Sequence, residues 1–146
     1  MVSCAVDEVL HYFPSVVRHA LRLVPMSSRR QLEEIRLRCC RPVMVVANGS
    51  DHFLRHDGIL SPGESTLIWE EQHAEQFLEA ITRASLYAME DDVRAGFLTL
   101  PGGHRVGLTG EAVMQGGQLQ TIKYVSCFNV RLARAIPGVA DNVLPA

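Results

Sequence analysis

Residues 100–113, LPGGHRVGLTGEAV, come closest in this chain to a phosphate-binding loop. Gly102 and Gly107 bracket four residues, and Thr109 stands where a P-loop places its Ser or Thr. Leu108, however, occupies the position of the P-loop lysine that binds the β- and γ-phosphates. The glycine spacing alone therefore does not define a nucleotide-binding loop.

The residues after the glycine pair favour a strand over the helix that a P-loop requires. Gly110 is a poor residue for a first helical turn. From His104 onward the chain alternates, with Val106, Leu108, Gly110 and Ala112 on one face and Arg105, Gly107, Thr109 and Glu111 on the other. This pattern predicts a hairpin turn at residues 101–103 that leads into a strand, with Arg105 on its polar face.

Three arginines are the candidate phosphate contacts. Arg105 lies on the polar face of this strand, and Arg131 lies on the polar face of residues 126–133, which also alternate. Arg134 closes that second strand, and His104 beside Arg105 is a possible secondary contact. If the two strands share a surface, their arginines form a cluster that can bind phosphate through paired hydrogen bonds. The alternative is a solvated face with ordinary Arg–Glu pairs, for example with Glu111.

The other reactive side chains predict neither a metal site nor a catalytic triad. The cysteines Cys4, Cys39, Cys40 and Cys127 lack Cys-x-x-Cys spacing and are expected to be reduced thiols. His52 and His56 are four apart but fall in a predicted strand, and Glu90, Asp91 and Asp92 are typical of a solvated turn.

The elements that must position these residues follow from hydrophobic periodicity. Residues 5–24 are predicted as one or two helices, with Pro14 near the start of the second, and residues 68–90 as a long helix. Strands are predicted at 34–38, 43–47, 51–58, 95–100, 104–114, 117–122 and 126–133, with hairpin turns at Asn48-Gly49, Gly102-Gly103 and Gly116-Gly117. The order of elements favours an α+β fold with a mostly antiparallel sheet packed with helices.

Composition sets the broad class of the protein. The chain has 146 residues, 47% of them hydrophobic and 21% charged, as in a globular domain. The net charge of −2 gives no electrostatic footprint for nucleic acid, so no nucleic-acid partner is expected. No apolar run is long enough for a transmembrane helix, and a cytoplasmic location is expected.

Several stretches together resemble the N-terminal half of the stage III sporulation protein AA family. They are EIRLRCCRPVMVV, ITRASLYAMEDDVRAGFLTLPGGHRVGLTGEAV and SCFNVRLARAIPG, within roughly residues 30–140. The resemblance implies membership of the secretion-ATPase superfamily and a PAS-like N-terminal domain over residues 31–146, after a helical segment at residues 1–30. It also implies a second, RecA-like domain that holds ATP and Mg²⁺, with Walker A and B motifs.

The resemblance also implies a role. Such motors form rings, usually hexamers, and their N-terminal arginines reach nucleotide bound on the RecA-like domain in the manner of an arginine finger. Arg105 is the best match by motif, and Arg131 or Arg134 supplies the second arginine. The expected partners are a RecA-like domain, in its own or a neighbouring subunit, and channel proteins in the membranes around the forespore, reached from the mother cell.

This sequence departs from the family pattern because it contains no Gly-x-x-x-x-Gly-Lys-Ser/Thr motif and no Walker B strand. The chain is therefore expected to be a regulatory and assembly domain that is inactive as an ATPase by itself. Two alternatives remain: a stand-alone PAS-like adaptor that only docks partners, and, less favoured by the charge, an RNA-binding domain.

Overall fold

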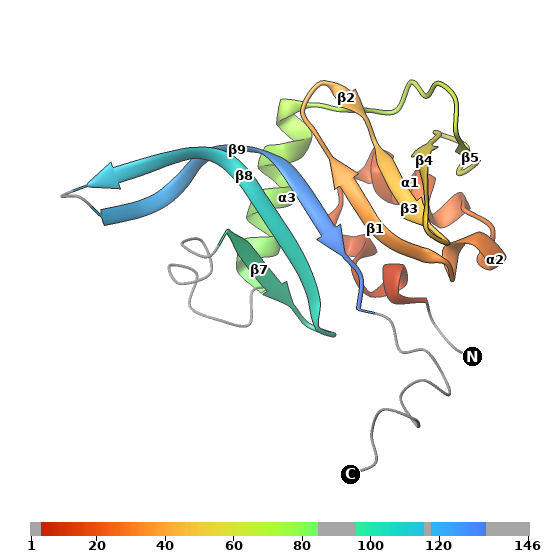
Figure 1. Ribbon diagram of the computed structural model, residues 1–146, viewed down its shortest axis with the longest axis horizontal. Helices are drawn as coiled ribbons and strands as arrows, with labels where there is room; N and C mark the ends of the chain where they lie inside the picture. Colours follow the sequence, from red (N-terminus) through yellow and green to blue (C-terminus); the bar gives the residue numbers. More distant parts are fainter. Residues whose placement is uncertain (1–3, 85–95, 116–117, 134–146) are drawn as a thin grey trace, which may run out of the picture.

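A seven-stranded antiparallel sheet forms the centre of the computed structural model (Figure 1). The structure describes residues 4–84, 96–115 and 118–133, and for residues 111–115 and 118–125 it describes the backbone. The strands are β1 (Leu32–Leu37), β3 (Met44–Ala47), β4 (Ser50–Leu54), β5 (Leu60–Ser61), β7 (Phe97–Leu100), β8 (His104–Gln115) and β9 (Gln118–Arg131). Their order across the sheet is β5-β4-β3-β1-β9-β8-β7. The predicted α+β class, with an antiparallel sheet and helices, is confirmed.

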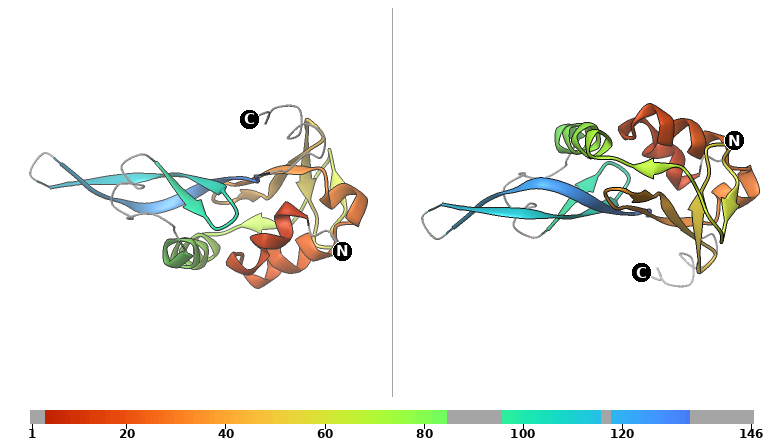
Figure 2. Two further views of the ribbon diagram at one scale, coloured as in Figure 1. Left: turned by 90° about the horizontal axis from the view of Figure 1, so that it is seen from below. Right: turned by 90° about the horizontal axis from the view of Figure 1, so that it is seen from above.

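The helical segments lie mainly on one side of this sheet, and the described residues leave its other face open (Figure 2). They are two 3₁₀ turns, η1 (Ala5–Glu8) and η2 (Leu10–Tyr12), followed by α1 (Ser15–Leu23), α2 (Met26–Arg29) and α3 (Glu71–Ala84). Within residues 5–24 the regular α-helix begins only after Pro14, and it ends before Pro25, as the sequence predicts. Of the predicted helix 68–90, residues 85–90 lie outside the described residues.

One hydrophobic core joins the helices to the covered face of the sheet. Its centre is an aromatic cluster in which Phe77 of α3 contacts Phe13 and Phe128 with ring centroids 4.8 and 4.9 Å apart. Trp69 packs edge-on against Phe77 and Phe128 at 5.8 and 6.0 Å. Because aromatic pairs favour such tilted and edge-to-face contacts, this cluster fixes α3 against β9.

The start of the long helix differs from the prediction. Residues 68–69 form a short strand, β6 (Ile68–Trp69), which pairs with β2 (Arg41–Pro42), and α3 begins at Glu71. The backbone N–H of Cys40 donates to the carbonyl of Trp69, and Trp69 is fully buried. Tertiary pairing therefore overrides the helical periodicity at this end, as non-local contacts commonly do.

Two of the three predicted hairpin turns are where the sequence places them. Ala47 pairs with Ser50 across Asn48-Gly49, whose φ angles are 51° and 77°, as expected for a two-residue hairpin loop. Gly102 and Gly103 also have positive φ and connect β7 to β8. The predicted turn at Gly116-Gly117 lies outside the described residues.

The last two predicted strands, 117–122 and 126–133, form one continuous strand, β9. It pairs with β8 from Arg105–Arg131 to Gln115–Gln118, with a register shift between Thr109 and Glu111 that interrupts the predicted alternation. Beyond the pairings with β7 and β1, this two-stranded ribbon extends away from the rest of the sheet (Figure 1). Arg105 and Arg131 lie at the other end of β8 and β9, where these strands pair with β7 and β1.

Candidate functional site

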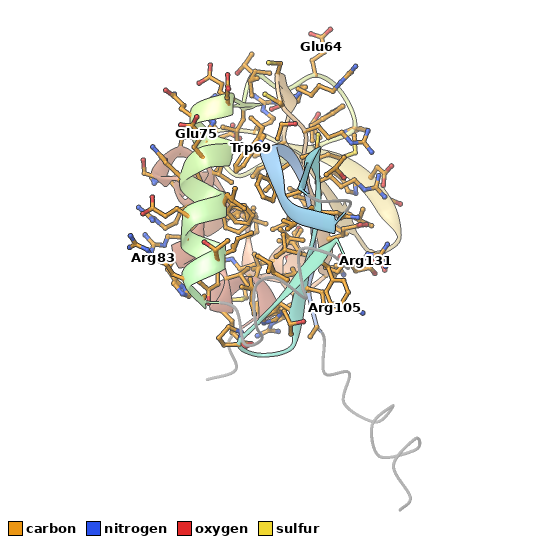
Figure 3. All side chains as sticks on the ribbon, turned by 90° about the vertical axis from the view of Figure 1, so that its left-hand side faces the viewer. Glu64, Trp69, Glu75, Arg83, Arg105 and Arg131 are labelled. Atoms are coloured by element: carbon orange, nitrogen blue, oxygen red, sulfur yellow. The ribbon has the colours of Figure 1, made fainter. Side chains whose placement is uncertain are left out.

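Strand alternation places Arg105 and Arg131 together on the open face of the sheet. In β8 the neighbours of Arg105, His104 and Val106, are fully buried, so the side chain of Arg105 faces the opposite way. Arg105 and Arg131 are direct cross-strand partners, and both are exposed. Figure 3 shows the two arginines on the side of the sheet away from α3. The predicted clustering of these two arginines is therefore present.

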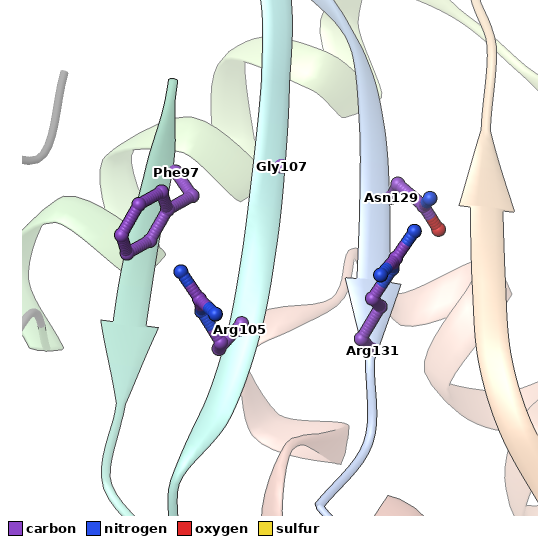
Figure 4. Close-up of a pocket in the computed structure, with 5 residues that line it drawn as sticks. All are labelled: Phe97, Arg105, Gly107, Asn129 and Arg131. Carbon is purple, nitrogen blue, oxygen red and sulfur yellow. The ribbon is translucent and has the colours of Figure 1, made fainter. Parts of the chain in front are cut away.

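A shallow hollow of about 240 Å³ opens between the two arginines (Figure 4). Its lining residues are Phe97, Arg105, Gly107, Asn129 and Arg131. Phe97, Gly107 and Asn129 lie side by side on β7, β8 and β9, because Gly107 pairs with both of the other two. The hollow is thus a site built by three neighbouring strands.

Phe97 holds the guanidinium of Arg105. The Cζ atom of Arg105 lies 4.0 Å from the centroid of the Phe97 ring, within the range of a cation–π contact. Within the described part of the chain, Arg105 has no carboxylate partner. The stacked guanidinium therefore keeps its charge and its N–H donors for a ligand.

Arg131 is partly compensated by Glu34 of β1. The Nε of Arg131 lies 3.7 Å from Oε1 of Glu34, and Glu34 also pairs with Arg36, whose Nη2 is 3.4 Å from Oε2. The Glu34 side chain is only 15% exposed, whereas that of Arg131 is 76% exposed. Arg36 makes a further pair with Asp51, at 3.5 Å. The carboxylate beside the arginines is thus Glu34, which comes from a strand distant in sequence.

His104 lies on the covered side of β8, away from the arginine pair. Its side chain is fully buried, and its Nδ1 accepts a hydrogen bond of 3.0 Å from the N–H of Ala133. A neutral ring that accepts at Nδ1 carries its proton on Nε2, which lies 3.5 Å from Oε1 of Glu8. His104 therefore binds the segment that follows β9 and lies close to Glu8 of η1, and the structure does not bring it into the hollow.

Arg134, the third predicted arginine, lies outside the described residues, as do Glu90, Asp91 and Asp92. Phe97, Asn129 and the pairing of Glu34 with Arg131 were not predicted from the sequence. The alternation of the strands does indicate that Glu34 and Asn129 lie on polar faces. It does not give the order of the strands across the sheet, so it could not place them beside the arginines. There is no such indication for the aromatic Phe97, because it belongs to an apolar run.

A second hollow of about 370 Å³ shares Gly107 and Asn129 with the first and continues toward Arg36, Arg38 and Cys127. Cys39 and Cys40 come after β1 and Arg38, and their Sγ atoms lie 3.6 Å apart without a disulfide. Burial, with the hydrogen bond to Cys40, raises the pKa of the Cys39 thiol. In residues 4–84, 96–115 and 118–133 no group of three or more His, Cys, Asp or Glu could hold a metal ion.

None of the helices in the part of the chain that the structure describes is long and apolar enough to span a membrane.

The fold and the hollow define a class: an α+β domain whose antiparallel sheet is covered by helices on one face and carries an arginine pair on the other. A family model described as "Sporulation stage III, protein AA" matches residues 6–146. The chain belongs to this stage III sporulation protein AA family.

Sequence identity between this chain and individual similar proteins is low. Stage III sporulation protein AA of Bacillus subtilis (strain 168) is 29% identical over 139 residues, which cover 95% of this chain and 42% of that protein. The chain thus spans about two fifths of the length of this relative. Among solved structures, the VirB11 ATPase from the Brucella suis type IV secretion system, in complex with sulphate, superposes with a TM-score of 0.46 and 15% identity. That superposition covers 89% of this chain and 35% of the VirB11 chain.

Proposed function

We propose that this chain is the N-terminal regulatory and assembly domain of a sporulation-associated ATPase of the secretion type. In this role it docks on a RecA-like domain that holds ATP and Mg²⁺, and its open face presents Arg105 and Arg131 to the phosphates. The observation that carries the proposal is the pair itself: two exposed arginines in direct cross-strand register on the face that the helices leave free.

The electrostatics of the pair support a phosphate contact. Two guanidinium groups on adjacent strands repel each other, and the nearby carboxylate of Glu34 is shared with Arg36. An anionic ligand between them relieves this repulsion, and arginine binds phosphate through two parallel hydrogen bonds. In an arginine-finger arrangement such a contact stabilises the charge that develops during phosphoryl transfer.

The small size of the hollow supports the proposed assembly. The hollow is too shallow to enclose a nucleotide, so the base, the sugar and Mg²⁺ must be held by the RecA-like domain of the same or a neighbouring subunit. A ring of such subunits, in the mother cell and next to a membrane channel, is the arrangement that the family resemblance suggests.

A mixing experiment tests this proposal. A RecA-like ATPase domain of the same family is assayed for ATP turnover alone and with increasing amounts of this chain. We expect stimulation by the wild-type chain, and at least a tenfold loss of that stimulation with Arg105→Ala, toward the roughly 10³-fold effect of typical arginine fingers. The matched control is Arg55→Ala, because Arg55 is an exposed arginine that pairs with Asp57 elsewhere on the molecule.

Two results would count against the proposed role. If Arg105→Ala stimulates turnover as well as the wild-type chain, Arg105 does not act on the nucleotide. If the wild-type chain binds the ATPase domain without changing its turnover, the chain is an adaptor that only docks partners.

A further inference from the structure

Gly107 forms the floor of the hollow, although the fold does not require glycine at this position. Its φ is not positive, and a Cβ at residue 107 would meet only the Cβ and carbonyl oxygen of Asn129, both at 3.8 Å. Those are ordinary van der Waals distances. Glycine inside a strand costs roughly 0.5–1 kcal/mol relative to alanine. Neither backbone conformation nor packing in the described part of the chain explains this glycine.

What glycine provides here is an uncovered stretch of backbone between an aromatic wall and a polar wall. Phe97 and Asn129 flank Gly107 on the neighbouring strands, and Arg105 and Arg131 lie two residues along β8 and β9 (Figure 4). A glycine inside a strand commonly marks the close approach of a ligand or another backbone. A side chain at residue 107 would project from the same face as Arg105 and fill the hollow from below.

The side chain of Asn129 forms the wall of the hollow on β9. Its side-chain Oδ1 is buried and makes no hydrogen bond within the part of the chain that the structure describes. Such unsatisfied buried acceptors are uncommon and call for an explanation. A phosphoryl group carries only acceptor oxygens and cannot satisfy this Oδ1, whereas the side-chain NH2 of Asn129 is a donor that can bind a phosphoryl oxygen.

The size of the hollow limits what it can hold. At about 240 Å³ it falls below the roughly 300–1,000 Å³ of sites that enclose a whole small molecule. It has room for a phosphoryl group and part of what is attached to it.

We propose that Gly107 is a ligand-binding residue: a phosphoryl group of a nucleoside polyphosphate rests over its bare backbone, between Phe97 and Asn129, and is bound by Arg105 and Arg131. This inference deepens the proposed function and rests on it, because it takes the ligand of the arginine pair to be a nucleotide phosphate. It adds the requirement that residue 107 has no side chain, which phosphate binding by arginine alone does not impose.

The test titrates the chain with ATP and, separately, with inorganic tripolyphosphate, in low salt without Mg²⁺, while backbone amide chemical shifts are followed by NMR. This method detects millimolar affinities. Gly107→Ala and Gly107→Val are compared with the wild type, and Gly63→Ala is the matched control. Gly63 also has no positive φ, and a Cβ added there would lie 3.5 Å from the Oγ of Ser61, again an ordinary contact.

In the wild-type chain both probes are expected to shift the amides of residues 105–107 and 129–131. Gly107→Ala is expected to raise both dissociation constants at least about fivefold, or roughly 1 kcal/mol, and Gly107→Val to raise them further. The melting temperature of Gly107→Ala is expected to be equal to or above that of the wild type. Gly63→Ala is expected to bind both probes normally.

Several outcomes would overturn the inference. They are wild-type affinity in Gly107→Ala, unfolding of Gly107→Ala, weakening toward ATP alone, and no shift at these amides in the wild type at tens of millimolar ligand. Failure here is distinguishable from failure of the proposed function. If Arg105→Ala abolishes stimulated turnover while Gly107→Ala binds normally, only the role of Gly107 is wrong; if Arg105→Ala leaves turnover intact, the proposed function itself is wrong.

Discussion

Arg36, Arg105 and Arg131 differ in how their charge is balanced. Arg36 and Arg131 share the carboxylate of Glu34, whereas Arg105 stacks on Phe97 and has no carboxylate partner in the described chain. An incoming phosphate can therefore bind Arg105 without displacing an acidic side chain. At Arg131 the phosphate must compete with Glu34, so this carboxylate is expected to limit the affinity of the site.

Replacing Glu34 tests this competition. Glu34→Gln removes the negative charge and keeps the size of the side chain, with one acceptor oxygen in place of two. We expect tripolyphosphate to bind about two- to fivefold more tightly, since Arg131 is exposed and ion pairs at the surface are typically worth about 0.2–1 kcal/mol. Isothermal titration or NMR titration measures the change.

A gain in affinity is informative because damage to the fold would produce a loss. Glu79→Gln is the matched control: Glu79 pairs with Arg83 on α3, on the covered side of the sheet, and its replacement should leave binding unchanged. Unchanged or weaker binding in Glu34→Gln would show that Glu34 does not compete for the site.

At the scale of elements, the alternation of polar and apolar residues along the strands correctly predicted which way their side chains face. It predicted that Arg105 and Arg131 lie on polar faces, and the buried residues next to each confirm it. It could not reveal that Glu34 lies beside Arg131, because cross-strand pairing joins residues almost a hundred positions apart in the sequence. The start of α3 was misplaced for the same reason, since Trp69 pairs with a strand near residue 41.

The packing of α1 against the β4–β5 turn gives a prediction at this scale. Gly58 has a φ of +80°, and a Cβ there would lie 2.4 Å from the backbone carbonyl carbon of Leu23. Gly58→Ala must therefore separate the end of α1 from the turn. We expect a loss of at least about 2 kcal/mol in the free energy of unfolding, because backbone strain at positive φ adds to the steric clash.

Gly49→Ala separates these two causes. Gly49 has a φ of +77°, but an added Cβ there meets nothing within 4 Å. This variant should lose only the roughly 1 kcal/mol expected from the unfavourable φ. Chemical denaturation measures both variants, and equal losses would mean that the close approach of Gly58 to Leu23 contributes nothing.

At the scale of the whole molecule, the distribution of helices decides which surface is available. The helices and the aromatic cluster occupy one face of the sheet, and the described chain leaves the arginine-bearing face uncovered (Figure 2). The sequence predicted the class of fold and the arginines. It did not predict the hollow, because the hollow depends on three strands lying side by side with a glycine at the centre.

The proposed function requires Arg105 and Arg131 to act together on one phosphate. A double-mutant cycle on stimulated ATP turnover tests it most directly, with Arg105→Ala, Arg131→Ala and the double variant mixed with the RecA-like domain at saturating concentrations. We expect each single variant to lower turnover and the double variant to lose less than the product of the two effects, because residues that share a ligand are energetically coupled. Strictly multiplicative losses, or a single variant with full turnover, would contradict the claim.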